Sequence, residues 1–285
     1  MQDLSLEIVN PSRVGGSIAL FLLLGILLFL EIGRWMGRRR VARQGEAAQS
    51  GIGSLEGAVF ALMGLLIAFT FAGALTRFDV RRGQAVDEAN AIGTAYLRIE
   101  LLPAAAQPRM RDRFREYVDS RIATYRALPD VAASRRELKR SEELQGEIWS
   151  QGVAATRMTE SRPGADLLFL PALNQMFDIR TVRVVATQMH PPSIVYVMLM
   201  GLGLVAGLLA GYQSAGQRAR DWPHHVGFAA IMALTVYVIL DIEHPRLGFV
   251  RLDAIDKVLI DLRKDMQDPE TPATVPPADR PVGAR

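Results

Sequence analysis

Cysteine is absent from this 285-residue chain, and aromatic residues make up only 7% of it. Without a thiol, the chain can hold no disulfide framework, no thiolate zinc site and no cysteine nucleophile. Catalytic signatures are scarce as well, because the sequence contains no G-x-S-x-G, P-loop or EF-hand pattern. The histidines His190, His224, His225 and His244 lack the spacing of a metal-binding helix. We therefore predict that the chain is not an enzyme and carries no metal or cofactor.

Four stretches of the chain almost lack charge, at residues 15–33, 57–76, 193–212 and 222–240. Glu31 is the only acidic or basic residue within them, if histidine is counted as neutral. A bilayer core requires about 20 mostly apolar residues for each spanning helix. The alternative is a buried soluble core, but four such runs in one soluble domain would be unusual. The pattern predicts an all-α integral membrane protein with four transmembrane helices in contact with the lipid bilayer.

The long region between the second and third spans is charged, with nearly equal numbers of basic and acidic side chains. This balance gives no support to nucleic-acid binding. Helical patterns occur at 79–102, from Pro108 to about residue 128, at 134–158 and at 166–190. Ser134 and Glu137 form a Ser-x-x-Glu capping box, which predicts a helix start at Ser134. We expect a helical extramembrane domain here.

Charge and proline patterns together divide the chain into five parts. We expect an N-terminal transmembrane hairpin (1–76), the helical domain (77–192), a C-terminal transmembrane hairpin (193–243), a helical tail segment (244–268) and a tail (269–285). The last part is rich in proline and lacks aromatic residues, which is typical of disorder.

Both expected hairpin loops, at 34–56 and 213–221, carry arginine and no lysine. The positive-inside rule would place these short loops in the cytoplasm, and the helical domain and both termini outside. A basic collar beside the lipid headgroups, which can lie on either face, is the other interpretation of the same arginines.

The end of the second span has a distinctive pattern. The apolar stretch passes directly into Arg77-Phe78 and then into a charged amphipathic helix, with the segment Asp87-Glu88-Ala89-Asn90. This resembles the bestrophin family of anion channels, and also an uncharacterised bacterial membrane family described as bestrophin-like. A second similar stretch follows the fourth span and contains Asp241, Pro245 and Gly248.

The sequence also departs from the bestrophin pattern. Phe78-Asp79 replaces a pair of tryptophans, and His244 replaces the asparagine of an Asn-Pro-Phe-Gly motif. Arg246 and Arg251 stand where animal bestrophins carry acidic residues for calcium, so the resemblance does not extend to calcium gating.

The resemblance implies a homopentameric chloride or other anion channel in the bacterial inner (plasma) membrane. It implies that the second helix lines the pore, with Ala61, Leu65 and Phe69 at the positions of the hydrophobic neck. It also places the helical domain and both termini in the cytoplasm, which disagrees with the short-loop count. We follow the resemblance on this point, and the orientation stays open.

Two further sets of residues are candidates for function or packing. Arg77, Arg81 and Arg82 could concentrate inorganic anions at the inner mouth of a pore, or could form a belt beside the headgroups. Asp87 and Glu88 could pair with arginines of neighbouring helices. Small residues at four-residue spacing predict close helix packing along the third span, namely Gly203, Gly207 and Gly211.

Two alternatives to the channel remain. One is a non-conducting membrane scaffold or sensor whose helical domain binds a partner protein. The other is a transporter subunit, which would lack the ionisable midplane residues often used for coupling.

Asp241 and Glu243 could bind a cation, but helix capping or pairing with Arg246 is favoured.

Overall fold

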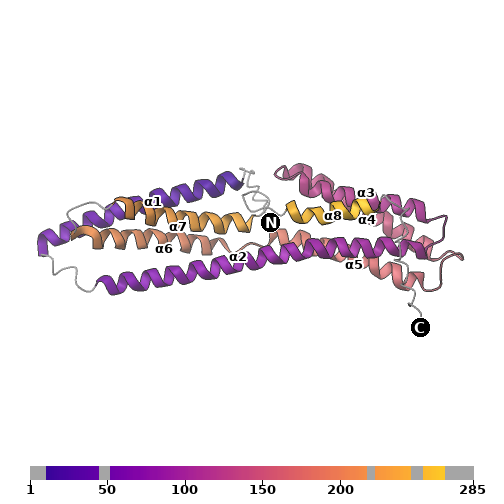
Figure 1. The fold of residues 1–285 in the computed structure, drawn as a ribbon, viewed down its shortest axis with the longest axis horizontal. Helices are drawn as coiled ribbons and strands as arrows, with labels where there is room; N and C mark the ends of the chain where they lie inside the picture. Colours follow the sequence, from indigo (N-terminus) through magenta and orange to yellow (C-terminus); the bar gives the residue numbers. More distant parts are fainter. Residues whose placement is uncertain (1–10, 45–51, 217–221, 245–252, 267–285) are drawn as a thin grey trace, which may run out of the picture. The chain divides into compact units, whose positions relative to one another are not determined.

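The computed structural model describes residues 11–44, 52–216, 222–244 and 253–266, and these residues form helices and no strand. The helices are α1 (Pro11–Gln44), α2 (Ile52–Leu97), η2 (Arg98–Leu101), α3 (Gln107–Arg126), α4 (Val131–Thr156), α5 (Ala165–Gln188), α6 (Ser193–Gln213), η3 (Ser214–Gly216), α7 (Trp222–Glu243) and α8 (Asp253–Asp265) (Figure 1). Four helical stretches in this part of the chain are long and apolar enough to cross a membrane: Gly15–Arg43, Gly53–Leu101, Ala165–Gly216 and Trp222–Glu243. The all-α prediction and the four candidate spans are therefore confirmed.

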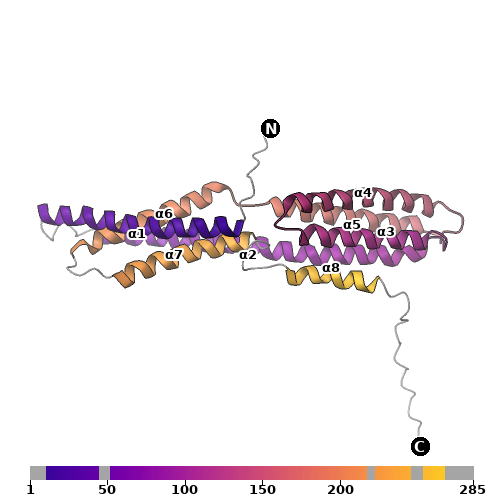
Figure 2. The ribbon, with the colours of Figure 1, turned by 90° about the horizontal axis from the view of Figure 1, so that it is seen from above.

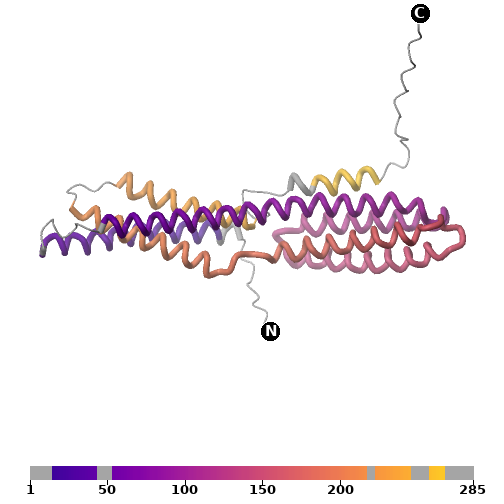
Figure 3. The backbone as a smooth tube through the Cα atoms, turned by 90° about the horizontal axis from the view of Figure 1, so that it is seen from below, coloured from indigo at the N-terminus to yellow at the C-terminus, as the bar shows by residue number. Residues whose placement is uncertain are grey.

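Helix α2 is the longest element, with 46 residues. It contains no proline, and it continues past the apolar span through Arg77 into the charged segment that follows. Figure 3 traces this helix without a break. The backbone tightens into η2 at Arg98 and leaves the helix at Leu102, just before Pro103. A residue before proline is disfavoured in the α conformation, which accounts for this end point.

Helices α3 and α4 begin with different start signals. Pro108 lies in the first turn of α3, where its missing N–H costs nothing. Helix α4 begins at Val131, because the Asp130 carboxylate accepts a hydrogen bond from the backbone N–H of Ala133 at 2.9 Å. The predicted start at Ser134 is therefore wrong. Ser134 lies within the first turn, and its hydroxyl instead donates to the carbonyl of Thr124 at 2.8 Å.

The chain divides into two compact units, each with its own core. The first unit comprises residues 1–85 and 180–254. In it, α1 packs against α6 and α7, with the first part of α2 alongside (Figure 1). Its fully buried apolar side chains come from α1, α6 and α7 and include Ile26, Leu199 and Ile239.

The second unit comprises residues 86–179 and 255–285. Its helices α3 and α4 pack closely against each other, and α5, α8 and the end of α2 complete the bundle (Figure 2). Its core is built around Phe114, Tyr117, Phe169 and Ile92, none of which is exposed to solvent. Leu259 brings α8 into the same core.

One predicted loop segment is helical in the structure, and other predicted features lie outside the described residues. The arginines at 34–43 belong to α1, which continues to Gln44, and so they do not lie in a loop. Pro245, Gly248, Arg246 and the tail 269–285 lie outside the described residues.

Candidate functional site

One face of α2 is open within the first unit. Leu65 is 52% exposed and Phe69 is 68% exposed, and Ala61 is exposed on the same face. These residues are four apart, so they lie one above the other along the helix. The opposite face packs into the unit through Met63, which is 5% exposed, and Ala74, which is fully buried. The three predicted neck residues thus form an apolar stripe that the described residues of the same unit leave largely exposed.

A buried carboxylate lies at the end of α7. Glu243 has no exposed side-chain surface, and it accepts hydrogen bonds from Arg77 Nε at 2.8 Å and from Arg77 Nη2 at 3.0 Å. This fork geometry is the strong form of an arginine–carboxylate pair. A second guanidinium, that of Arg81, lies 3.7 Å from the Glu243 carboxylate.

Arg81 is almost fully buried and is held mainly by backbone oxygens. It donates to the carbonyls of Ala186 at 3.1 Å, Glu243 at 2.8 Å and Met189 at 2.9 Å. These contacts tie the end of α7 and the last turn of α5 to α2. Arg82, the third predicted basic residue, is exposed on α2. Two of the three predicted arginines are therefore engaged within their own chain, and the third is not buried.

Two histidines complete this cluster. The rings of His190 and His244 stack with their centroids 4.8 Å apart, and His190 Nδ1 lies 3.5 Å from Glu243. Burial lowers the pKa of His244, and the neighbouring His190 adds to this effect. The Leu240 carbonyl, 3.1 Å from His244 Nδ1, and the Glu243 carboxylate oppose the shift without cancelling it.

The sequence did not predict that Glu243 pairs with Arg77 and Arg81. The favoured partner from sequence, Arg246, lies outside the described residues. The available signal was a glutamate, Glu243, at the end of an apolar span. A carboxylate in that position needs a cationic partner, because a buried charge is costly unless it is paired.

The residues of the acidic segment after the second span lie on different faces of α2. Asp87 and Asn90 are exposed, whereas Glu88 is fully buried in the second unit. Glu88 pairs with the equally buried Arg121 at 2.6 Å, and Tyr125 is bonded to the same guanidinium. This is the pairing with a neighbouring helix that the sequence suggested for Glu88. Burial alone would lower the pKa of Arg121, but Tyr125 and Glu88 outweigh it and raise the pKa.

Asp241, from the bestrophin-similar stretch after the fourth span, is buried on α7 and interacts with another group. Within the described part of the chain, no group of three or more His, Asp or Glu side chains is placed to hold a metal ion.

Glycines line the contact between α1 and α6. A Cβ added at Gly211 would collide with the Leu30 carbonyl, and one at Gly207 would lie 3.1 Å from the Ile26 carbonyl. Gly203 is less tight, because its nearest neighbour would be Leu22 at 3.7 Å. The contacts advance together along both helices, so α1 and α6 run parallel. Missing side chains at these positions allow the two backbones to approach closely.

These features define an all-α membrane protein, in which four apolar helices accompany a second helical unit with its own core. The bestrophin-like domain, as a family, matches residues 24–254, and the chain belongs to this family. No curated protein and no solved structure gives a significant match to the chain.

Proposed function

We propose that this bestrophin-like protein assembles as a homopentamer and conducts chloride or other inorganic anions along an axis lined by α2. The observation that carries the proposal is the uncovered stripe of Ala61, Leu65 and Phe69 on α2. A ring of large apolar side chains can close a narrow pore to water and ions by dewetting. Leu65 and Phe69 supply such side chains one helical turn apart, and Ala61 leaves a wider entrance.

Anion preference would come from the basic end of α2. Arg77 and Arg81 share a single carboxylate, Glu243, so their combined charge is not neutralised by that pair. Arg82 adds an exposed cation one residue further along. Repeated around a five-fold axis, this surplus would concentrate anions at one mouth of the pore.

The arrangement in the membrane is part of the same proposal. Residues 77–192 form an extramembrane helical domain on the cytoplasmic side of the bacterial inner membrane, together with both termini. The separate core of the second unit and the charged surfaces of α3 and α4 support an aqueous environment for this domain. A reporter fused to the C-terminus tests the orientation directly.

Chloride flux into liposomes tests the channel. Purified protein should pass chloride, and Leu65→Ala combined with Phe69→Ala should change gating or conductance. Phe21→Ala is the matched control, since Phe21 is 71% exposed on α1 and should leave the flux unchanged. A well-folded pentamer without flux would exclude the channel function.

A second candidate is a non-conducting scaffold or sensor whose helical domain binds a partner protein. The observation that favours it is the exposure of large apolar side chains on the second unit, such as Leu167 at 75% and Leu97 at 70%. Co-purification of a stoichiometric partner, without ion flux from the pure protein, would support this function over conduction.

A further inference from the structure

The outward face of α1 changes from apolar to cationic toward the end of the helix. Leu28, Ile32 and Trp35 are exposed large apolar side chains, three or four residues apart. Arg39 and Arg43 follow at the same spacing and are exposed as well. These five side chains therefore share one face of the helix, and the glycines that contact α6 lie on the opposite face.

The change occurs at a contact between Trp35 and Arg39. The guanidinium carbon of Arg39 lies 3.7 Å from the centroid of the Trp35 ring, which is a cation–π geometry. Tryptophan is enriched at the level of the lipid headgroups, because its ring is apolar and its N–H is polar. The contact therefore marks the point on α1 where the apolar face ends and the headgroup region begins.

The positive charge at this end of α1 is not balanced nearby in sequence. Residues 32–45 contain five arginines and no acidic residue. Arg38, Arg39 and Arg43 are exposed, and none of them forms an ion pair with a carboxylate of the described residues. The described part of the chain thus leaves three cations at this position without a counter-charge.

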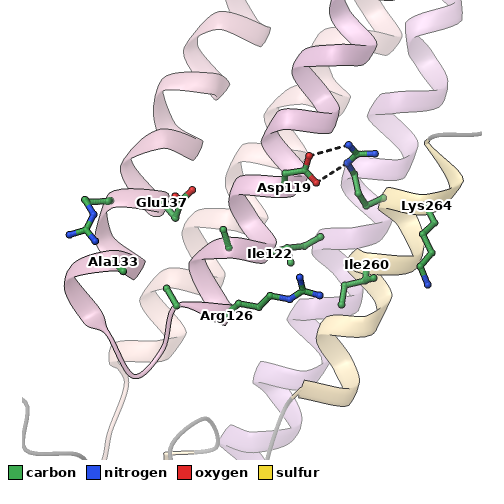
Figure 4. A pocket seen from close by; sticks show the side chains of 11 residues that line it. Asp119, Ile122, Arg126, Ala133, Glu137, Ile260 and Lys264 are labelled. Carbon is green, nitrogen blue, oxygen red and sulfur yellow. Dashed lines mark hydrogen bonds and ion pairs between the residues drawn. The ribbon is translucent and has the colours of Figure 1, made fainter.

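A hollow in the second unit differs in this respect. It has a volume of about 670 Å³ between α3, α4 and α8, and Arg126 and Arg263 are among its lining residues (Figure 4). Arg263 donates to both oxygens of Asp119, from Nε at 2.8 Å and from Nη2 at 3.1 Å, and Lys264 lies 3.4 Å from Asp261. Two cations of the hollow therefore have carboxylates of their own, unlike the three arginines of α1.

The length of the outward face fits one leaflet of a bilayer. From Leu28 to Arg39 the helix rises by about 16 Å, at about 1.5 Å per residue. This is close to half of the hydrocarbon thickness of about 30 Å. The face thus offers apolar contact over the length of an acyl chain and positive charge at the level of the headgroup.

We propose that the outward face of α1 binds an anionic phospholipid. Arg39 and Arg43 hold the phosphate, whose oxygens suit the planar donors of a guanidinium group. An acyl chain lies along Leu28 and Ile32. A zwitterionic lipid fits less well, because its headgroup brings a second positive charge to a surface that already has an excess. This site is independent of the proposed conduction along α2.

Fluorescence quenching of Trp35 in lipid vesicles tests the site. The chain has three tryptophans, so Trp149→Phe combined with Trp222→Phe leaves Trp35 as the only one. The vesicles contain equal amounts of phosphatidylglycerol and phosphatidylcholine, and the acyl chains of one lipid or the other carry bromine, which quenches indole fluorescence on contact. Brominated phosphatidylglycerol should quench Trp35 more strongly, with a relative binding constant about fivefold or more in its favour.

Three double variants in this background identify the source of the preference. Arg39→Gln with Arg43→Gln should remove it, so that both brominated lipids quench equally. Arg39→Lys with Arg43→Lys keeps the charge and should retain most of the preference. Arg135→Gln with Arg140→Gln is the matched control, because it removes two exposed cations from α4 in the second unit and should leave the preference unchanged.

Three results would overturn the proposal. Equal quenching of Trp35 by the two brominated lipids would show that the face does not select for charge. The absence of quenching by either lipid would show that protein, such as a second copy of the chain, covers this face. A preference that survives Arg39→Gln with Arg43→Gln would place the anionic lipid elsewhere.

Discussion

Glu243 shows how one buried side chain connects several segments of the chain. Its carboxylate receives Arg77 from α2, lies near Arg81, and has His190 from the segment after α5 at 3.5 Å. A buried ion pair contributes little net free energy to stability, but the loss of one partner is strongly destabilising. Removing one partner leaves the other charge buried without compensation.

Glu243→Gln should therefore destabilise the protein by about 3 to 5 kcal/mol, the range found when a buried ion pair loses one partner. Chemical unfolding in mild detergent measures the change. Glu143→Gln is the control, because Glu143 is 65% exposed and lies 3.9 Å from Lys139. That substitution should change the stability by less than about 0.5 kcal/mol. Equal stabilities of the two variants would contradict the anchoring role of Glu243.

His244 predicts a pH dependence at the same cluster. Burial lowers its pKa below the usual value of 6.5, so the unfolded chain binds a proton at this site more readily than the folded chain does. The contribution of His244 to stability is thus intact above pH 6.5 and is lost as the pH falls below that value.

The melting temperatures of the unmodified chain and of His244→Gln, measured between about pH 7.5 and about pH 5.5, check this sign. The unmodified chain should lose more stability on acidification than the variant does. A steeper loss in the variant would show that the folded state favours the charged imidazole.

At the scale of the element, the close contact between α1 and α6 depends on glycines, which have no side chain. Gly33 and Gly37 on α1 and Gly207 and Gly211 on α6 each have a backbone atom of the other helix within 3.4 Å of an added Cβ. Lipid tails are as apolar as the helices, so close packing replaces the hydrophobic effect as the force that joins them. Added volume at this contact has to push the two backbones apart.

Gly211→Ala should destabilise the first unit by about 1 to 3 kcal/mol, because its methyl group would meet the Leu30 carbonyl. Gly201→Ala is the control on the same helix, since an added Cβ there has nothing within 4 Å. Thermal unfolding in detergent compares the two variants. If Gly201→Ala were the more damaging change, helix propensity or lipid contact would outweigh the packing.

At the scale of the whole molecule, the described residues form two cores, and α2 supplies buried side chains to both of them. The uncovered stripe on α2 is the surface where a second copy would have to lie if the protein is an oligomer around this helix. A stripe that faces lipid would instead leave neighbouring copies far apart at these positions.

The absence of cysteine makes this distinction directly testable. Phe69→Cys should form disulfide-linked dimers within the membrane on mild oxidation, because neck residues of adjacent copies meet near the axis. Phe21→Cys, at an equally exposed position on α1, should stay monomeric on a non-reducing gel. Native mass spectrometry should give five copies per assembly. Cross-linking at position 21 but not at position 69 would place a different helix at the axis.

Much of the helix content was predictable because its signals are local. The four apolar runs predicted α1, α6, α7 and the first part of α2, and periodicity predicted α3 and α5 to within a few residues. The start of α4 was missed by three residues. Asp130 and Ser134 both carry capping side chains, and only the packing of Ser134 against Thr124 decides between them.

The division into units follows packing more than hydropathy. By sequence, the boundaries lie where the apolar spans end, at 76/77 and 192/193. In the structure the boundaries lie at 85/86 and 179/180, inside α2 and inside α5, so each of these helices contributes residues to both units. Helix periodicity alone does not indicate into which of the two cores a given turn of a helix packs.

By itself the sequence determined the class of the protein, because apolar length, helical period and the absence of thiols are properties of neighbouring residues. It also placed Ala61, Leu65 and Phe69 on one helix face. Only the tertiary structure decided that Glu243 lies with Arg77 and Arg81, that Glu88 lies with Arg121, and that Arg126 and Arg263 line one hollow. These pairs are brought together by chain segments far apart in sequence, and charge alone does not choose among the many available partners.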